Sequence, residues 1–218
     1  MKRKYVVIGL GNFGFWVAKT LFEAHQETIA IDMNKEAVQR VNKFSNMAVI
    51  ADVTNKETLV GLGIADCDAA VVSLGDHPAA STLVTLYLHE MGVKQILVKA
   101  IDENHAKILR KVGATDIIFP EKDMGIKVAK TLVSPNILDF IEMTEDYEIT
   151  QIGPPASFIG KTLMELELPS RFGLQVIAVR ELIPENFIPA PRADFVIKDS
   201  DILYILGRKK DIERIKAL

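Results

Sequence analysis

The sequence predicts an α/β protein: a Rossmann-like, doubly wound parallel sheet followed by a small α+β subdomain. Three observations lead to this prediction. Short apolar runs alternate with amphipathic stretches of helical length up to about residue 119. Most of these runs are continuously apolar, as in strands covered on both faces of a parallel sheet. Beyond residue 141 the pattern changes to short strands and turns, which indicates a second domain.

Six β-branched, apolar runs are predicted to form the strands of the parallel sheet. They recur about every 20 residues, which is the spacing of a strand plus a crossover helix in a doubly wound fold. The runs are residues 5–8, 28–31, 48–51, 69–72, 95–98 and 116–119.

Helix signals fill the segments between these runs. Pro78 opens one amphipathic stretch and Gly92 follows its end, the expected order of proline first and glycine last. The last helix of this half, residues 121–132, runs toward Pro135, and the residue before a proline is pushed out of the helical region. We therefore expect a hinge over residues 132–140.

The hinge predicts a domain boundary, with a nucleotide-binding domain over residues 1–140 and a smaller domain over residues 141–218. The second domain is expected to hold short strands and one closing helix with apolar residues at three-residue spacing. The strands are predicted at residues 147–152, 174–179, 195–197 and 202–206, and the helix at residues 210–218.

Composition excludes several classes of protein. The chain has 26 basic and 29 acidic residues, so it lacks the broad positive charge from which duplex nucleic acid binding gains most of its affinity. Its one cysteine, Cys67, can form neither an intramolecular disulfide nor a cysteine cluster for zinc. No segment approaches the ~18 consecutive apolar residues of a membrane span. The apolar run near the start is interrupted by glycines and lacks a cleavage site, so it is not expected to be a signal peptide. A cytosolic protein is expected.

Residues 9–14 read Gly-Leu-Gly-Asn-Phe-Gly, a G-x-G-x-x-G motif between a predicted strand and a predicted helix. In this context Gly9 permits a tight turn, Gly11 lets a pyrophosphate approach the backbone, and Gly14 lets helix and strand pack closely. The amino terminus of the helix then faces the phosphates. The motif alone is weak, but its position between strand and helix predicts a nucleotide site.

Asp32 closes the second predicted strand, 18 residues after Gly14. A carboxylate there can accept hydrogen bonds from an adenosine ribose, and it would repel a 2′-phosphate, which disfavours NADP. The alternative is that Asp32 caps the helix predicted over residues 34–41.

Two more polar segments follow predicted strands on the same edge of the sheet, where open α/β sheets place their ligands. Residues 52–54 (Asp-Val-Thr) are predicted to reach the adenine edge, with an N-cap for the next helix as an equal alternative. Residues 73–76 (Ser-Leu-Gly-Asp) follow the fourth strand.

The residues expected of a dehydrogenase are missing from the second half. Hydride transfer usually needs an acid–base group on a substrate domain, most often histidine, and all four histidines lie at or before His105. A nucleotide pocket without visible chemistry indicates a sensor, not an enzyme. A small NAD-dependent oxidoreductase is kept as the alternative, and a DNA-binding redox repressor would need a basic winged-helix module that this sequence lacks.

Four segments together resemble RCK domains that regulate potassium conductance, of the KtrA/TrkA type. They are residues 9–14, residues 32–34 (Asp-Met-Asn), residues 51–54 (Ala-Asp-Val-Thr) and residues 119–125 (Phe-Pro-Glu-Lys-Asp-Met-Gly), the last being the most specific. The resemblance covers essentially the whole chain as a TrkA-N (RCK-N) domain followed by a TrkA-C (RCK-C) domain.

The resemblance implies a cytosolic regulatory subunit of a bacterial Ktr potassium uptake system. Such subunits form homodimers and then an octameric ring beneath a membrane channel subunit of the KtrB/TrkH type, and exchange of ATP for ADP changes the ring; NAD(H) binds some relatives, and AMP is a further alternative. The residues expected to contact the nucleotide are Gly9, Gly11, Asn12, Phe13, Gly14, Asp32, Met33, Asn34, Asp52, Val53, Thr54, Ser73, Leu74, Gly75 and Lys99.

Three finer expectations also come from the resemblance. Glu121 is expected to coordinate a divalent cation, Mg²⁺ or Ca²⁺, although an acid that stabilises a helix amino terminus is the alternative. Asn12 stands where ATP-responsive relatives carry arginine, so we expect only a weak preference for ATP over ADP. Residues 188–191 (Ile-Pro-Ala-Pro), with Arg180, are expected to bind cyclic di-AMP, with a proline-rich surface turn as the alternative.

Overall fold

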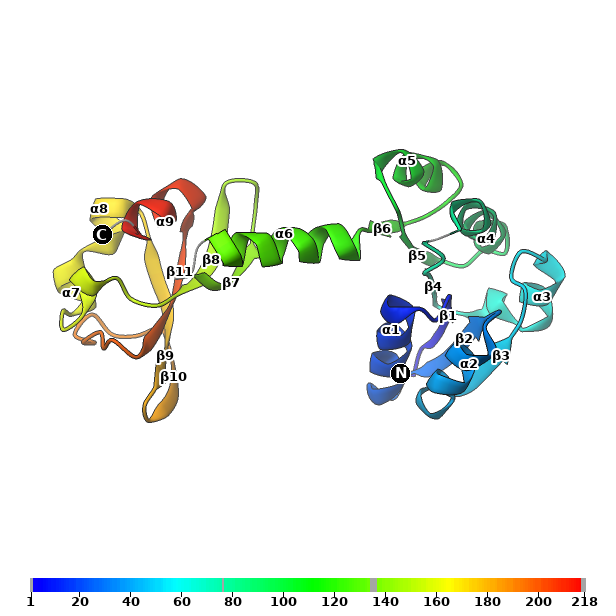
Figure 1. Ribbon diagram of the computed structural model, residues 1–218, viewed down its shortest axis with the longest axis horizontal. Coiled ribbons are helices and arrows are strands. Elements are labelled where there is room, and N and C mark those ends of the chain that lie inside the picture. Colours follow the sequence, from blue (N-terminus) through cyan, green and yellow to red (C-terminus); the bar gives the residue numbers. More distant parts are fainter. Residues whose placement is uncertain (1, 76, 134–136, 217–218) are drawn as a thin grey trace. The chain divides into compact units, whose positions relative to one another are not determined.

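The computed structural model describes residues 2–75, 77–133 and 137–216 (Figure 1). The chain divides into two compact units, Met1–Asp123 and Met124–Leu218. This division falls inside helix α6 (Pro120–Val133), earlier in the chain than the predicted boundary after residue 140, which stays a prediction. The centre of the predicted hinge, Ser134 to Asn136, and Asp76 lie outside the described residues.

The first unit contains a six-stranded sheet in which every neighbouring pair of strands is parallel. Its order, β3-β2-β1-β4-β5-β6, reverses between β1 and β4, the point at which doubly wound sheets bind ligands. The predicted fold class is therefore confirmed. The strands are β1 (Lys4–Ile8), β2 (Glu27–Asp32), β3 (Met47–Ile50), β4 (Ala69–Val72), β5 (Gln95–Lys99) and β6 (Asp116–Ile118).

The sheet of the first unit is buried on both faces because its strands are apolar at consecutive positions. Val6 and Ile8 of β1 pack into one core cluster together with Leu88. Val7, between them, points to the opposite face and packs into a second cluster with Ala18. The helices of this unit are α1 (Asn12–Glu23), α2 (Lys35–Val41), α3 (Lys56–Gly61), α4 (Pro78–Glu90) and α5 (Glu103–Lys111), with 3₁₀ turns η1 (Asn42–Phe44) and η2 (Ile64–Asp66).

The second unit contains a five-stranded antiparallel sheet of order β10-β9-β11-β8-β7. One face carries the core, in which Val179 and Leu203 pack with Ile212 and Ile215 of the closing helix. The elements are β7 (Ile137–Glu142), β8 (Tyr147–Ile152), η3 (Ala156–Phe158), α7 (Leu163–Leu166), α8 (Leu168–Phe172), β9 (Gln175–Leu182), β10 (Glu185–Pro189), β11 (Asp201–Arg208) and α9 (Lys209–Lys216).

One strand predicted for the second unit is wrong. Residues 195–197 form only an isolated bridge, between Val196 and Thr162, although Ile197 is fully buried. The apolar run thus reflects burial of a loop against the core. Strands β7 and β10 were not predicted. In the part of the chain that the structure describes, no helix has the length and apolar character needed to span a membrane.

Candidate nucleotide-binding site

The glycine loop between β1 and α1 is packed tightly against the loop after β4. Gly9 has a φ of +88°, and a Cβ there would lie 2.4 Å from the carbonyl oxygen of Ser73. A Cβ at Gly14 would lie 1.9 Å from the carbonyl oxygen of Gly9. Around Gly11, by contrast, no described heavy atom lies within 4 Å of a Cβ. Two glycines therefore close the turn, and the middle one leaves open space.

The open space at Gly11 lies at the amino terminus of α1. Gly11 is the N-cap residue, and among the described side chains none caps this helix end. The first N–H groups of a helix have no acceptor within it, and the helix dipole places partial positive charge there. Of the first two residues of α1, Asn12 is exposed and Phe13 is half-buried. This end of the helix can therefore accept an anion such as a phosphate.

Asp32 is held in place at the end of β2 by two backbone N–H groups. Its Oδ2 accepts a hydrogen bond from the N–H of Leu10 at 2.6 Å, and its Oδ1 accepts one from Asn34 at 2.8 Å. A carboxylate has about four acceptor positions, so two remain for hydroxyl groups. The alternative role as a helix cap does not apply, because the side chain of Asn34 caps α2 by accepting from Glu36 and Ala37.

Asp52 and Thr54 form a turn after β3. The Oδ1 of Asp52 accepts hydrogen bonds from the Thr54 hydroxyl at 2.7 Å and from the Thr54 N–H at 2.9 Å. These bonds lower the pKa of Asp52, so the carboxyl is ionised at neutral pH. The N-cap of α3 is Asn55, whose side chain accepts from Glu57, so the alternative that Asp52 caps this helix is wrong.

A cleft of about 670 Å³ opens at the carboxyl ends of β1, β2 and β3, within the size range of small-molecule sites. It brings together more than half of the residues that were predicted to contact the nucleotide. Those in its lining are Gly9, Asp32, Met33, Asn34, Asp52, Val53, Thr54 and Leu74. Seven residues predicted to contact the nucleotide are not in the lining of this cleft: Gly11, Asn12, Phe13, Gly14, Ser73, Gly75 and Lys99.

Six lining residues were missed by sequence reasoning. Two are apolar residues at the ends of strands, Ile8 of β1 and Ile31 of β2. The other four, His77 and residues 78–80, lie at the start of α4. The available signal was their position directly after the fourth strand, on the edge where the other polar segments lie. His77 lines the cleft, and its imidazole is a group that can donate or accept a hydrogen bond.

Lys99 and Glu121 form an ion pair beside the loop after β4. The ammonium of Lys99 donates to Oε1 of Glu121, and this bond lowers the pKa of Glu121. The side chain of Lys99 runs past Gly75, where a Cβ would lie 3.1 Å from Cε. Lys99 is only 18% exposed, whereas Glu121, in the first turn of α6, is 69% exposed. Lys99 is therefore held between the strand end and α6.

The predicted cation at Glu121 finds little support within one chain. Among the described residues, no group of three or more histidine, cysteine, aspartate or glutamate side chains could hold a metal ion. Glu121 is instead neutralised by Lys99. A cation there would need further ligands from a nucleotide or a second copy of the chain.

The single cysteine, Cys67, is not an activated nucleophile. Cys67 is buried, and burial raises the pKa of its thiol to about 11, so the thiol stays protonated at neutral pH.

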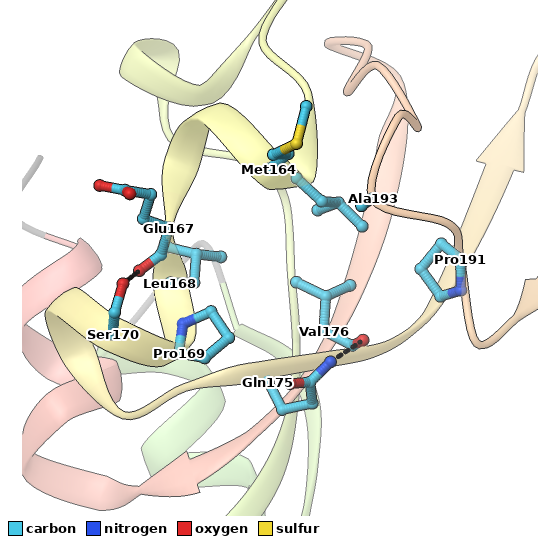
Figure 2. A pocket seen from close by; sticks show the side chains of 10 residues that line it. Met164, Glu167, Leu168, Pro169, Ser170, Gln175, Val176, Pro191 and Ala193 are labelled. Atoms are coloured by element: carbon cyan, nitrogen blue, oxygen red, sulfur yellow. Dashed lines mark hydrogen bonds between the residues drawn. The ribbon is translucent and has the colours of Figure 1, made fainter.

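The second unit contains a pocket of about 340 Å³ (Figure 2). Figure 2 shows Met164, Leu168 and Val176 presenting apolar surface to it, with Pro191 on the opposite side. Of the residues predicted to bind cyclic di-AMP, Pro191 lines this pocket. Arg180 does not, and its guanidinium lies 2.5 Å from Oε1 of Glu185.

Comparison with known proteins identifies the two domains. The TrkA-N domain matches residues 5–120 and the TrkA-C domain matches residues 149–218. The chain is 37% identical over 216 residues to the Ktr system potassium uptake protein C of Bacillus subtilis (strain 168), covering 99% of this chain and 97% of that protein. It is 36% identical over 214 residues to protein A of the same system and organism, covering 98% and 96%.

A solved structure supports the fold. The GsuK channel bound to NAD superposes with a TM-score of 0.66 at 17% identity, covering 99% of this chain and 40% of that one. The resemblance inferred from the sequence motifs is thus confirmed, and the chain belongs to the family of Ktr system potassium uptake proteins, with a TrkA-N and a TrkA-C domain.

Proposed function

We propose that this chain is a cytoplasmic, nucleotide-sensing regulatory subunit of a potassium uptake system. The observation that carries the proposal is the identity of 37% over nearly the full length of a Ktr system potassium uptake protein. The pore belongs to a separate membrane subunit of the KtrB/TrkH type. Homodimers of the chain assemble into an octameric ring that contacts this subunit at the inner face of the membrane.

The ligand of the cleft is an adenine nucleotide, either ADP or ATP, with NAD(H) and AMP as competitors. The open amino terminus of α1 binds the phosphates, and Asp32 accepts hydrogen bonds from the ribose hydroxyls. Asp52 and Thr54 lie on the adenine side. The GsuK channel was solved with NAD bound, which is consistent with a dinucleotide in this fold.

Lys99 couples the phosphates to helix α6. A phosphate at the glycine loop competes with Glu121 for the ammonium of Lys99, since both ligands are anionic. When Lys99 turns toward the phosphate, the carboxylate of Glu121 becomes available to a divalent cation, Mg²⁺ or Ca²⁺. The nucleotide shifts the ring between two shapes only through such differences in binding, with a coupling of about 1–3 kcal/mol as the usual scale.

Cyclic di-AMP is the proposed ligand of the second unit. The pocket in Figure 2 has apolar walls for a base and polar groups at its rim, including Gln175 and Ser170. Pro191 connects it with the segment that was predicted to bind this nucleotide.

Isothermal titration calorimetry of the full chain with ADP, ATP and NADH tests the nucleotide proposal. Because Asn12 offers a neutral amide, we expect ATP to be preferred over ADP by less than about tenfold, or ~1.4 kcal/mol. A larger preference would contradict the reasoning about Asn12, and absence of all binding would contradict the sensor.

Potassium flux into vesicles tests the regulatory role. The vesicles contain the membrane subunit from the same organism, oriented with its cytoplasmic side facing outward. Flux is compared between vesicles with this chain added to the outside and vesicles without it. We expect the flux to depend on both the chain and the nucleotide. Steady oxidation of NADH by the chain with a small carbonyl compound would instead favour an oxidoreductase.

A further inference from the structure

We propose a hard-cation site in the second unit, where Asn186, Glu181 and Asp201 form a row of side chains across strands β10, β9 and β11. Glu181 is directly opposite Asn186 in the β9–β10 ladder and directly opposite Asp201 in the β9–β11 ladder. Side chains that are directly opposite each other lie on the same face of a sheet with Cβ atoms about 5 Å apart. Three adjacent strands thus bring two carboxylates and one amide together at one end of the sheet.

The two carboxylates of the row are buried, whereas Asn186 is exposed. Asp201 is 2% exposed and Glu181 is 9% exposed. One ammonium, that of Lys198, lies 2.5 Å from Oε1 of Glu181. Two carboxylates against one ammonium leave an excess of one negative charge. Burying an uncompensated charge is costly, so a further positive group at this position would stabilise the two carboxylates.

One oxygen of the row lacks any partner. Oδ2 of Asp201 accepts a hydrogen bond from the N–H of Lys198 at 2.8 Å, but Oδ1 is buried and has no hydrogen-bond partner among the described residues. The unpartnered oxygen therefore points to a ligand that bonds to it directly.

The row offers free acceptor oxygens, which are the ligands that a hard cation takes. The amide nitrogen of Asn186 donates to Oε2 of Glu181 at 3.2 Å, so its amide oxygen remains available. Ca²⁺ takes several carboxylate, amide and water oxygens in a flexible geometry, whereas Mg²⁺ requires a near-ideal octahedron that three strands at a fixed spacing do not offer. A cation of the size of Ca²⁺ fits this donor set.

Lys198 is paired with one ligand of the proposed site, Glu181, in the structure. Its side chain is 52% exposed, so the ammonium can move into solvent. When it leaves, the two carboxylates carry two negative charges, which matches a divalent ion. Lys198 and the cation compete for Glu181, and removal of the ammonium should strengthen cation binding. The site does not depend on the proposed nucleotide function, because all four residues belong to the second unit.

Calorimetric titration of the full chain with CaCl₂ tests the proposal. The protein carries Glu121→Gln, which removes the other proposed cation ligand, and contains no nucleotide. We expect one saturable site per chain. Lys198→Met should lower the Kd about tenfold, and Asp201→Asn should raise it about tenfold, since ligand charge sets the affinity of such sites. Parallel titrations with MgCl₂ and KCl should give weaker binding.

Glu185→Gln is the matched control. Glu185 is on the same strand as Asn186, is 71% exposed and pairs with Arg180 outside the row, so this change should leave the Kd unaltered. Should Asp201→Asn fail to fold, Glu181→Gln removes a ligand from the same row and should weaken binding in the same way. Equal Ca²⁺ affinity in Asp201→Asn and the parent protein, or no saturable binding to Lys198→Met, would overturn the proposal while leaving nucleotide binding untouched.

Discussion

Gly11 and Gly14, three positions apart at the start of α1, should respond in different ways to substitution by alanine. At Gly11 a Cβ meets no described atom within 4 Å, and the φ of −59° is one that alanine adopts readily. At Gly14 a Cβ would lie 1.9 Å from the carbonyl oxygen of Gly9 and 3.0 Å from its carbonyl carbon. Both of these are backbone atoms, which cannot turn aside as a side chain can.

The magnitudes follow from these environments. For Gly11→Ala, the smaller entropy of the unfolded chain contributes about 0.4–1 kcal/mol of stability, and loss of a favoured N-cap residue removes a similar amount. The free energy of unfolding should therefore change by less than about 1 kcal/mol. The methyl group, however, occupies the space through which a pyrophosphate approaches the backbone, so nucleotide affinity should fall at least about tenfold. For Gly14→Ala, helix α1 must shift, at a cost of about 3 kcal/mol or more.

Calorimetry separates the two outcomes. Differential scanning measures unfolding, and titration with ADP and with NADH measures binding. Gly11→Ala should unfold within a few degrees of the parent protein. Gly14→Ala should lower the unfolding temperature of the first unit while leaving the second unit, which has its own core, unchanged. If Gly11→Ala binds both nucleotides as tightly as the parent protein, the assignment of the phosphate site to this loop is refuted.

Three further predictions concern charged side chains. Asp32→Asn should lower ADP affinity by about tenfold, measured by titration, and should let NADPH bind better relative to NADH, because the repulsion of a 2′-phosphate is removed. Lys99→Gln should weaken ADP binding, yet change the free energy of unfolding by at most about 1 kcal/mol, because its ion pair with Glu121 is partly exposed. Hydrogen bonds from Lys130 and, second, from Lys209 lower the pKa of Glu142 in the folded protein. The ionised Glu142 therefore contributes its full stabilisation of the folded state above the pKa of an unfolded glutamate, and this stabilisation is lost as the pH falls through the lower pKa of the folded state. Glu142→Gln should thus be less stable than the parent protein near pH 7, by at most about 1 kcal/mol, and equal to it in acid, as measured by urea unfolding across pH.

The parallel sheet was predictable because burial on both faces leaves a local signal. Val6, Val7 and Ile8 are consecutive apolar residues whose side chains enter two different core clusters. The antiparallel sheet leaves a weaker signal. Strand β10 includes Asn186 and Pro189, which have low strand propensity, and it forms because the β9–β10 hairpin places it beside β9.

The candidate site was predictable to the extent that each residue follows a strand. Asp32 is a polar residue at the end of an apolar run, so its position on the sheet edge could be inferred. Contacts that depend on tertiary packing could not be inferred from the sequence. The ion pair of Lys99 and Glu121 joins residues 22 positions apart, and His77 enters the cleft because α4 packs against the sheet.

The energy of the Lys99–Glu121 pair limits what one chain can do in the proposed mechanism. A partly exposed ion pair contributes at most about 1 kcal/mol, which is the most that its exchange for a phosphate can transmit to the first turn of α6. Regulation of a channel generally needs a coupling of about 1–3 kcal/mol. The difference must come from groups that a single chain does not contain, namely the nucleotide's own phosphates, a cation bound to the released Glu121, and contacts with neighbouring subunits. A monomeric variant should therefore bind nucleotide and still fail to regulate potassium flux, whereas the assembled ring should do both.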